Sequence, residues 1–161
     1  MTDQEMPFGD WSSADELLDR AVALGASHAE VRGMVVSTRS LNTSDGDVES
    51  TARSRESGTS VRVLVNGCWG FAASDSTVAT GDLVTRAVEM ARASAALVTE
   101  AVVLAPEPSW VGTWAGPCEV DPTVVPEAEV RDLLLQRESR LAANSIVKHT
   151  TGSFTGVTES T

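Results

Sequence analysis

The stretch 58–72 constrains the fold of this chain more than any other part of its sequence. Valines alternate with other residues over 61–65, which is the period-two pattern of a β-strand. Asn66-Gly67 follows, and this dipeptide supplies the two positive-φ positions of a type I′ turn. An apolar and aromatic segment then returns over 68–72. The sequence therefore predicts a β-hairpin with a two-residue turn.

This turn also predicts which residues share each face of the hairpin, because directly paired residues point to the same side. One face carries β-branched and small residues, which leave room for a helix to pack closely: Val61, Val63, Val65, Cys68, Gly70 and Ala72. The opposite face carries Arg62, Leu64, Trp69 and Phe71. That second face is too apolar to meet only water, so the hairpin is expected to be covered on both sides.

Three amphipathic segments predict helices around this hairpin. The first begins at a capping box with Ser13 and Glu16 and ends at Gly25. The second covers 82–91, and the third opens at Pro126, a residue suited to a first helical turn. Their predicted buried positions are Leu17, Leu18, Ala21 and Val22, then Leu83, Val84, Ala87, Val88 and Ala91, then Val130, Leu133, Leu134 and Leu141.

The remaining patterns predict strands. Residues 29–41 read as extended, with Val31, Val35 and Leu41 on one face, and a turn at Asp45-Gly46 leads into a returning strand over 48–55. With a connection at 56–58, four consecutive strands result, and residues 145–161 are again extended. The predicted fold class is α+β, a two-layer domain in which an antiparallel β-meander packs against two to three helices.

Length and composition bound the class of protein. A chain of 161 residues suffices for one domain, which we place at 13–161 after a flexible lead-in at 1–12. The net charge of −11 argues against nucleic-acid binding and against docking on an anionic membrane. No apolar run approaches the roughly 20 residues of a membrane span, and no signal-peptide pattern opens the chain. We therefore expect a cytoplasmic protein.

No catalytic or metal-binding residue is predicted in this chain. A zinc site needs about three protein ligands, and the histidines and cysteines are only His28, His149, Cys68 and Cys118, without a paired motif. The histidines are expected at the surface or at caps, and the cysteines as reduced thiols, with Cys68 a small buried side chain. No Gly-x-Ser-x-Gly motif or phosphate-binding glycine loop is present.

Several blocks together resemble the N-terminal domain of the TldD/PmbA family. They are the segment 23–32, Asp45-Gly46 with Val48-Glu49, the segments 58–63 and 66–72, and Glu119-Val120-Asp121-Pro122 followed by Val125-Pro126. The last block is similar to the TldD branch in particular. The resemblance runs from about residue 14 to the end of the chain.

This resemblance implies a zinc metallopeptidase, also described as a modulator of DNA gyrase. Such proteins form homodimers or TldD–TldE heterodimers and trim unfolded peptides in a closed chamber. The family's His-Glu-x-x-x-His motif and cysteine ligand belong to its C-terminal half, and no position here matches them. We therefore expect zinc only in a C-terminal domain absent from this chain. The expected partners are a family subunit and an unfolded peptide.

Three functions compete at this point. The chain is expected to be a non-catalytic N-terminal domain that helps to form the peptide chamber, and it ends without a closing element, as a piece of a longer protein would. A free-standing module that docks on a full-length partner and regulates it is the alternative, and an independent small enzyme is the third. The Arg62, Leu64, Trp69 and Phe71 face is the candidate docking surface for a C-terminal half, a second subunit or a peptide.

A competing interpretation covers that face from within the domain. Residues 105–126 hold five of the six prolines together with Trp110 and Trp114, and two tryptophans predict a segment that packs on the domain. If it packs over the hairpin, the candidate docking face is internal core. The sequence leaves these two interpretations open.

Overall fold

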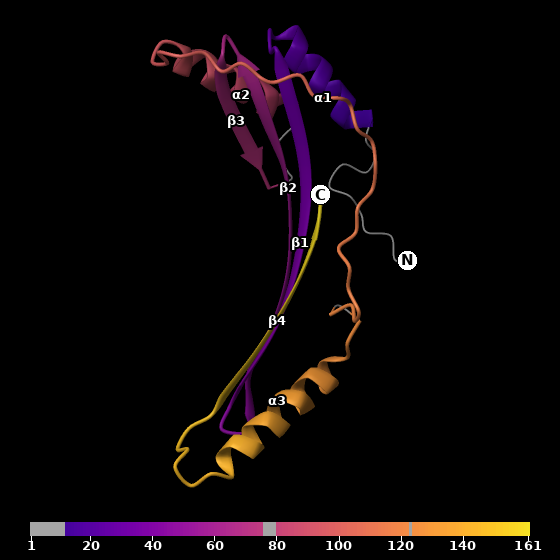
Figure 1. Ribbon diagram of the computed structural model, residues 1–161, viewed down its shortest axis with the longest axis vertical. Helices are drawn as coiled ribbons and strands as arrows, with labels where there is room; N and C mark the ends of the chain where they lie inside the picture. Colours follow the sequence, from indigo (N-terminus) through magenta and orange to yellow (C-terminus); the bar gives the residue numbers. More distant parts are fainter. Residues whose placement is uncertain (1–11, 76–79, 123) are drawn as a thin grey trace. The chain divides into compact units, whose positions relative to one another are not determined.

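The computed structural model describes residues 12–75, 80–122 and 124–161 (Figure 1). In chain order the elements are α1 (Ser12–Ala23), β1 (His28–Ser44), β2 (Asp47–Val65), β3 (Cys68–Ser74), α2 (Thr80–Ala95), α3 (Glu127–Ala142) and β4 (Thr151–Ser160). The strands form one antiparallel sheet with the order β3-β2-β1-β4. This confirms the predicted α+β class. The predicted lead-in at 1–12 lies outside the described residues except for Ser12.

Strand β2 corrects one detail of the predicted topology. It runs without interruption over Asp47–Val65, so the connection predicted at 56–58 is wrong and only three strands follow one another. A Cβ on Gly58 would lie 3.0 Å from the carbonyl oxygen of Ser74, which shows that this glycine serves a close approach to the end of β3. The fourth strand, β4, comes from the end of the chain and pairs beside β1.

The chain divides into two compact units, and each is described here by itself. The first unit comprises the described residues of Met1–Val35, Glu56–Val111 and Ser160–Thr161. The second comprises those of Val36–Arg55 and Gly112–Glu159. Strands β1 and β2 are long enough to contribute one part of their length to each unit. No helix among the described residues is long and apolar enough to cross a membrane.

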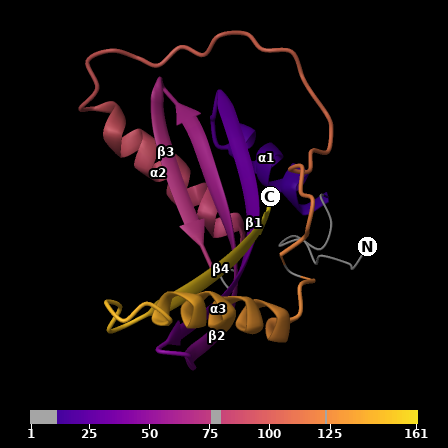
Figure 2. The same cartoon turned by 60° about the horizontal axis from the view of Figure 1, so that its bottom comes forward.

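The core of the first unit lies between the sheet and two helices. Figure 2 shows α1 and α2 on the same side of β1, β2 and β3. All five predicted apolar positions of α2 are no more than 1% exposed, and Val61, Val63 and Val65 of β2 face them. A Cβ on Gly70 would clash with the carbonyl oxygen of Ala87. The prediction that small residues of β3 admit a closely packed helix is therefore confirmed.

Helix α1 ends as its sequence predicts but buries a slightly different stripe. Gly25 has a φ of +91°, and the backbone N–H of Ala26 donates to the carbonyl of Ala21 at 3.0 Å, which closes the helix. Leu17 and Ala21 are buried as predicted, whereas Val22 is 63% exposed. Val22 was wrongly assigned because the stripe that meets the sheet includes Ala14 instead. The side chain of the predicted cap Ser13 lies outside the described residues.

In the second unit, α3 is held by a polar contact that its apolar pattern does not reveal. The helix follows Pro126 as predicted, and Val130 is buried, but Leu133 and Leu141 are more than half exposed. Glu138 is only 2% exposed, and its carboxylate accepts hydrogen bonds from Thr43 Oγ1 at 2.5 Å and from the backbone N–H of Gly46 at 2.8 Å. The helix therefore binds the β1–β2 turn through a buried acid.

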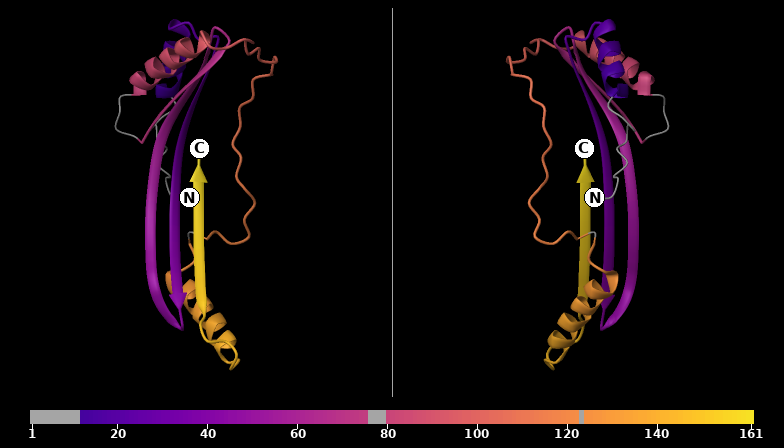
Figure 3. Two further views of the ribbon diagram at one scale, coloured as in Figure 1. Left: turned by 90° about the vertical axis from the view of Figure 1, so that its left-hand side faces the viewer. Right: turned by 90° about the vertical axis from the view of Figure 1, so that its right-hand side faces the viewer.

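A second polar contact holds the segment before α3. The guanidinium of Arg39 in β1 donates to the carbonyl of Val125 at 2.7 Å and to that of Pro122 at 2.8 Å. The same group lies 5.2 Å from the centre of the Phe154 ring in β4, a cation–π geometry. Figure 3 shows α3 and β4 in two further views. Arg39 thus ties the entry of α3 to two strands of the second unit.

Both hairpin turns have the backbone that the sequence predicts. Asn66 and Gly67 have φ values of +51° and +74°, and Asp45 and Gly46 have +51° and +87°. In the β2–β3 hairpin the predicted register is confirmed throughout, from the pair Val65–Cys68 to the pair Val61–Ala72. The two turns therefore share one conformation but differ in what surrounds them.

We expect Gly67→Val to destabilise the protein more than the matched variant Gly46→Val. Both substitutions force a β-branched residue into positive φ, at a cost of about 1–3 kcal/mol. A Cβ at Gly67 would in addition lie 2.5 Å from the Cβ of Ala101, whereas nothing lies within 4 Å of one at Gly46. Denaturant midpoints of both variants test this. An unchanged midpoint for Gly67→Val would contradict the turn assignment.

Candidate functional site

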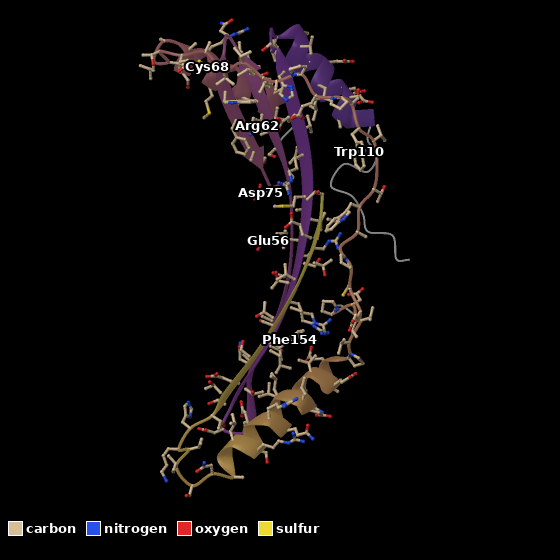
Figure 4. The ribbon with its side chains drawn as sticks, viewed as in Figure 1. Glu56, Arg62, Cys68, Asp75, Trp110 and Phe154 are labelled. Atoms are coloured by element: carbon tan, nitrogen blue, oxygen red, sulfur yellow. The ribbon has the colours of Figure 1, made fainter. Side chains whose placement is uncertain are left out.

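The candidate site is the face of β1, β2 and β3 in the first unit that points away from α1 and α2, here called the outer face. The register pairs Arg62 with Phe71 and Leu64 with Trp69, so the four predicted residues share this face. Val31 and Ala29 of β1 pack toward the helices. By strand alternation their neighbours His28 and Glu30 belong to the outer face. Figure 4 shows the position of Arg62.

A charged and aromatic cluster occupies the centre of the outer face. The Arg62 guanidinium donates to both carboxylate oxygens of Glu30, with Nε–Oε2 at 3.1 Å and Nη2–Oε1 at 2.7 Å. It also lies 4.5 Å from the centre of the Trp69 ring. The His28 ring meets that indole edge-on at 5.9 Å, and its Nε2 lies 3.0 Å from Glu30 Oε1. Arg62 is thus engaged on two sides.

These contacts decide the electrostatics of the face. The hydrogen bond from Arg62 lowers the pKa of Glu30, with a smaller contribution from His28, and partial burial opposes this shift. In turn, the Glu30 carboxylate raises the pKa of Arg62. The two charges compensate each other within the protein. The outer face therefore offers a ligand or partner an aromatic and apolar surface on which the Arg62 guanidinium is already bound to an acid.

The apolar part of the outer face is uneven. Leu64 is only 5% exposed and belongs to the packed interior, whereas Phe71 is 51% exposed. Trp69 lies between these extremes. Met34, which alternates with the buried Val35 on β1, is 38% exposed. A partner that docks here would therefore contact the exposed side chains of Phe71 and Met34. The buried Leu64 would contribute by packing beneath them.

The two tryptophans of the proline-rich segment are exposed rather than packed. Trp110, which belongs to the same unit as the outer face, is 81% exposed, and Trp114 has the same exposed fraction. The prediction that these tryptophans pack on the domain is therefore wrong. Prolines at 106 and 108 lack an N–H and oppose pairing with a strand. Figure 4 shows Trp110 on the connection between α2 and α3.

The histidines and cysteines form no metal site in the part of the chain that the structure describes. There, no group of three or more His, Cys, Asp or Glu side chains could hold a metal ion. His28 bonds Glu30, and His149 Nδ1 lies 2.7 Å from Asp45 Oδ2. Cys68 is a buried free thiol as predicted, and Cys118 is an exposed one. The donor set does not fit the catalytic zinc that the resemblance implies for the family.

A hollow of about 620 Å³ lies in the second unit beside the β1–β2 turn and α3. Its lining includes Asp45, Glu138 and His149. Asp45 accepts from the backbone N–H of Thr150 at 2.9 Å and Glu138 from Thr43 and Gly46, so both carboxylates already have protein partners. These acids hold structure together, and we assign them no catalytic role.

Comparison with known proteins finds similarity to metallopeptidases in both a family model and a curated protein. Residues 29–95 match the family model described as PmbA/TldA metallopeptidase domain 1. A curated metalloprotease from Methanothermobacter thermautotrophicus is 29% identical over 123 residues, which cover 76% of this chain and 26% of the relative. Over residues 29–95 the chain is therefore similar in sequence to PmbA/TldA metallopeptidase domain 1.

Solved structures share the fold at low sequence identity. A proposed modulator of DNA gyrase from Bacteroides thetaiotaomicron has a TM-score of 0.70 at 16% identity over 92% of this chain. A second, from Thermotoga maritima, has a TM-score of 0.52 at 17% identity over 91%. The chain spans about a third of each of these proteins, 34% and 35%, and about a quarter of the metalloprotease.

We expect Leu64→Ser to lower the free energy of unfolding much more than Phe71→Ser, because Leu64 is a buried residue of the outer face and Phe71 an exposed one. Leu64→Ser removes a buried side chain and should lower the free energy of unfolding by about 2–5 kcal/mol. Phe71→Ser should lower it by only about 1 kcal/mol, because half of that side chain already meets solvent. Denaturant unfolding of both variants measures this. Equal large losses would show that Phe71 belongs to the interior.

We also expect the stability of the Arg62–Glu30 pair to depend on pH. The pKa of Glu30 is lower in the folded state than its ordinary value of about 4.5, so the pair contributes stability above that pH. The contribution is lost as the pH falls through the folded-state pKa. The difference in unfolding free energy between the wild type and Arg62→Gln should therefore be larger at pH 7 than at an acid pH below the folded-state pKa of Glu30. A difference that stays constant with pH would contradict this role.

Proposed function

We propose that this chain is the non-catalytic N-terminal domain of a TldD-type zinc metallopeptidase, which trims unfolded peptides. In that role it contributes to the peptide-binding chamber and to the assembly of subunits. The observation that carries the proposal is the match of residues 29–95 to PmbA/TldA metallopeptidase domain 1, in a fold shared with a gyrase-modulator protein over 92% of the chain. The working compartment is then the cytoplasm.

The outer face supports a role in assembly. It is not covered by Trp110, and it presents Phe71 at half exposure beside a compensated ion pair. An apolar and aromatic surface whose Arg62 charge is compensated by Glu30 suits docking on another protein surface better than binding a charged small molecule. The partner we propose is a subunit of the PmbA/TldD family, in a homodimer or a heterodimer. The alternative is a free-standing module that docks on such a subunit and regulates it.

The proposed division of labour assigns no chemical step to this chain. Zinc, held by a different domain, would supply the activated water for peptide hydrolysis. The described residues lack a fitting set of ligands for it. Their contribution is to present surfaces, and the rigid core between α2 and the hairpin keeps those surfaces in place.

We expect the 161-residue chain alone to bind no stoichiometric zinc and to cleave no unfolded peptide. The reason is the absence, among the described residues, of a three-ligand cluster. Elemental analysis after purification in metal-free buffer, together with a peptide-cleavage assay, tests this. About one zinc per chain, or cleavage that a chelator abolishes and zinc restores, would overturn the proposal.

Two further measurements separate the proposed function from its alternative. A reading frame that continues past Thr161 into a His-Glu-x-x-x-His helix would support the N-terminal domain, whereas a stop codon would favour the free-standing module. In both cases Phe71→Ser should weaken association with a family subunit, measured by sedimentation. Unchanged association of the Phe71→Ser variant would contradict the proposal that the outer face docks on a family subunit.

A further inference from the structure

Strand β4 forms an edge of the sheet. In the order β3-β2-β1-β4 its only strand neighbour among the described residues is β1. The row of backbone N–H and C=O groups on its other side therefore has no strand partner in the described sheet. Figure 3 shows β4 in yellow along β1. Such an edge is a template for pairing with another extended chain.

The sequence of this edge lacks the features that normally prevent such pairing. Residues 151–158 contain no proline and no charged residue, although the chain as a whole carries a net charge of −11. Strand β2 pairs with β3 only over 59–65, so its residues 47–58 form the opposite edge of the described sheet, and that stretch carries Arg53, Arg55 and Glu56. Charge and proline are the usual protection of exposed edges. Here the β2 edge carries such charges, whereas the β4 edge is neutral.

The surroundings of β4 cover one of its faces and leave the edge open. Its residues alternate between half-buried and exposed along the strand. The half-buried set includes Gly152, which lies against Glu138 and Leu134 of α3, and Phe154, which lies under Arg39. Residues 112–121 of the same unit are exposed throughout. A Cβ on Gly156 would lie 3.6 Å from the Cβ of Pro122, so Pro122 adds to the covered face of the strand.

Contacts at its start and in its middle hold β4 in place before any partner arrives. The backbone N–H of Asp45 donates to the carbonyl of Thr150, and the N–H of Thr150 donates to Asp45 Oδ1, both at 2.9 Å. The Arg39–Phe154 contact fixes the middle of the strand. A pre-ordered edge does not lose conformational freedom on binding, which favours association.

From these observations we propose that the outer edge of β4, residues 151–158, binds an extended, unfolded peptide by strand addition. This inference rests on the proposed function, because it names the surface by which the domain would take a peptide. Recognition is by backbone hydrogen bonds. The exposed side chains Ser153, Thr155 and Val157 are uncharged, so they do not select the peptide by its charge.

The test uses the 161-residue chain and two synthetic peptides of the same neutral, valine- and threonine-rich sequence. One peptide is unmodified, and the other is N-methylated at each central residue, so it cannot donate backbone hydrogen bonds. Amide hydrogen exchange is followed over the whole chain. The unmodified peptide should slow exchange in 151–158, and the methylated peptide should not. Protection confined to the outer face, or equal protection by both peptides, would overturn the inference.

Two proline variants add a control on the strand itself. Along an antiparallel edge strand, alternate residues direct their N–H to the neighbouring strand and to the open side. Thr155→Pro and Thr158→Pro stand at positions of opposite parity, so one removes an outward N–H and the other disrupts pairing with β1. The variant that keeps the wild-type unfolding midpoint should bind the peptide about fivefold more weakly. Unchanged affinity in that variant would overturn the inference.

The outcomes separate this inference from the proposed function. If the peptide binds and protects residues outside β4, the peptide-handling role survives and the edge assignment fails. If no peptide binds while the chain still associates with a family subunit, the edge assignment also fails and assembly stands. If the chain cleaves peptide with zinc, the proposed function itself fails, whatever the exchange pattern shows.

Discussion

The first unit depends on the close approach of α2 to the β2–β3 hairpin. Gly70 leaves no side chain between the helix and the strand, and any Cβ there would meet the backbone of Ala87 and Ala91. The valines of β2 fill the rest of the interface with the helices. The opposite side of the same strands carries the outer face, where Arg62 contacts Glu30 and Trp69.

The second unit is held together by a different kind of contact. Its helix buries little apolar surface, and three polar side chains connect its elements: Glu138 at the β1–β2 turn, Arg39 at the entry of α3, and Asp45 at the start of β4. These polar contacts fix the geometry of the unit, and the buried one at Glu138 is the most costly to break when one partner is removed. The edge strand that we propose as a peptide site is positioned by these contacts.

Sequence reasoning identified the hairpin face but missed half of the cluster on it. A two-residue turn at Asp45-Gly46 would by itself pair Glu30 with Val61 and place both on one face of the sheet. Instead the Glu30 side chain bonds Arg62, and Val61 lies in the core. No local pattern signals that Glu30 meets Arg62 rather than Val61. The alternation of β1 around the buried Val35 was the one signal that could have placed His28 and Glu30 correctly.

Local chemistry alone determined the β2–β3 register, the positive-φ turns and the buried stripe of α2, because each depends on residues a few positions apart. Tertiary structure decided the rest. It placed β4 beside β1, extended β2 through Gly58, and buried Glu138 while exposing Leu133, Trp110 and Trp114. These outcomes depend on which distant segments meet and on which hydrogen-bond partners they bring. An apolar residue is buried only where another surface meets it, and a sequence pattern does not name that surface.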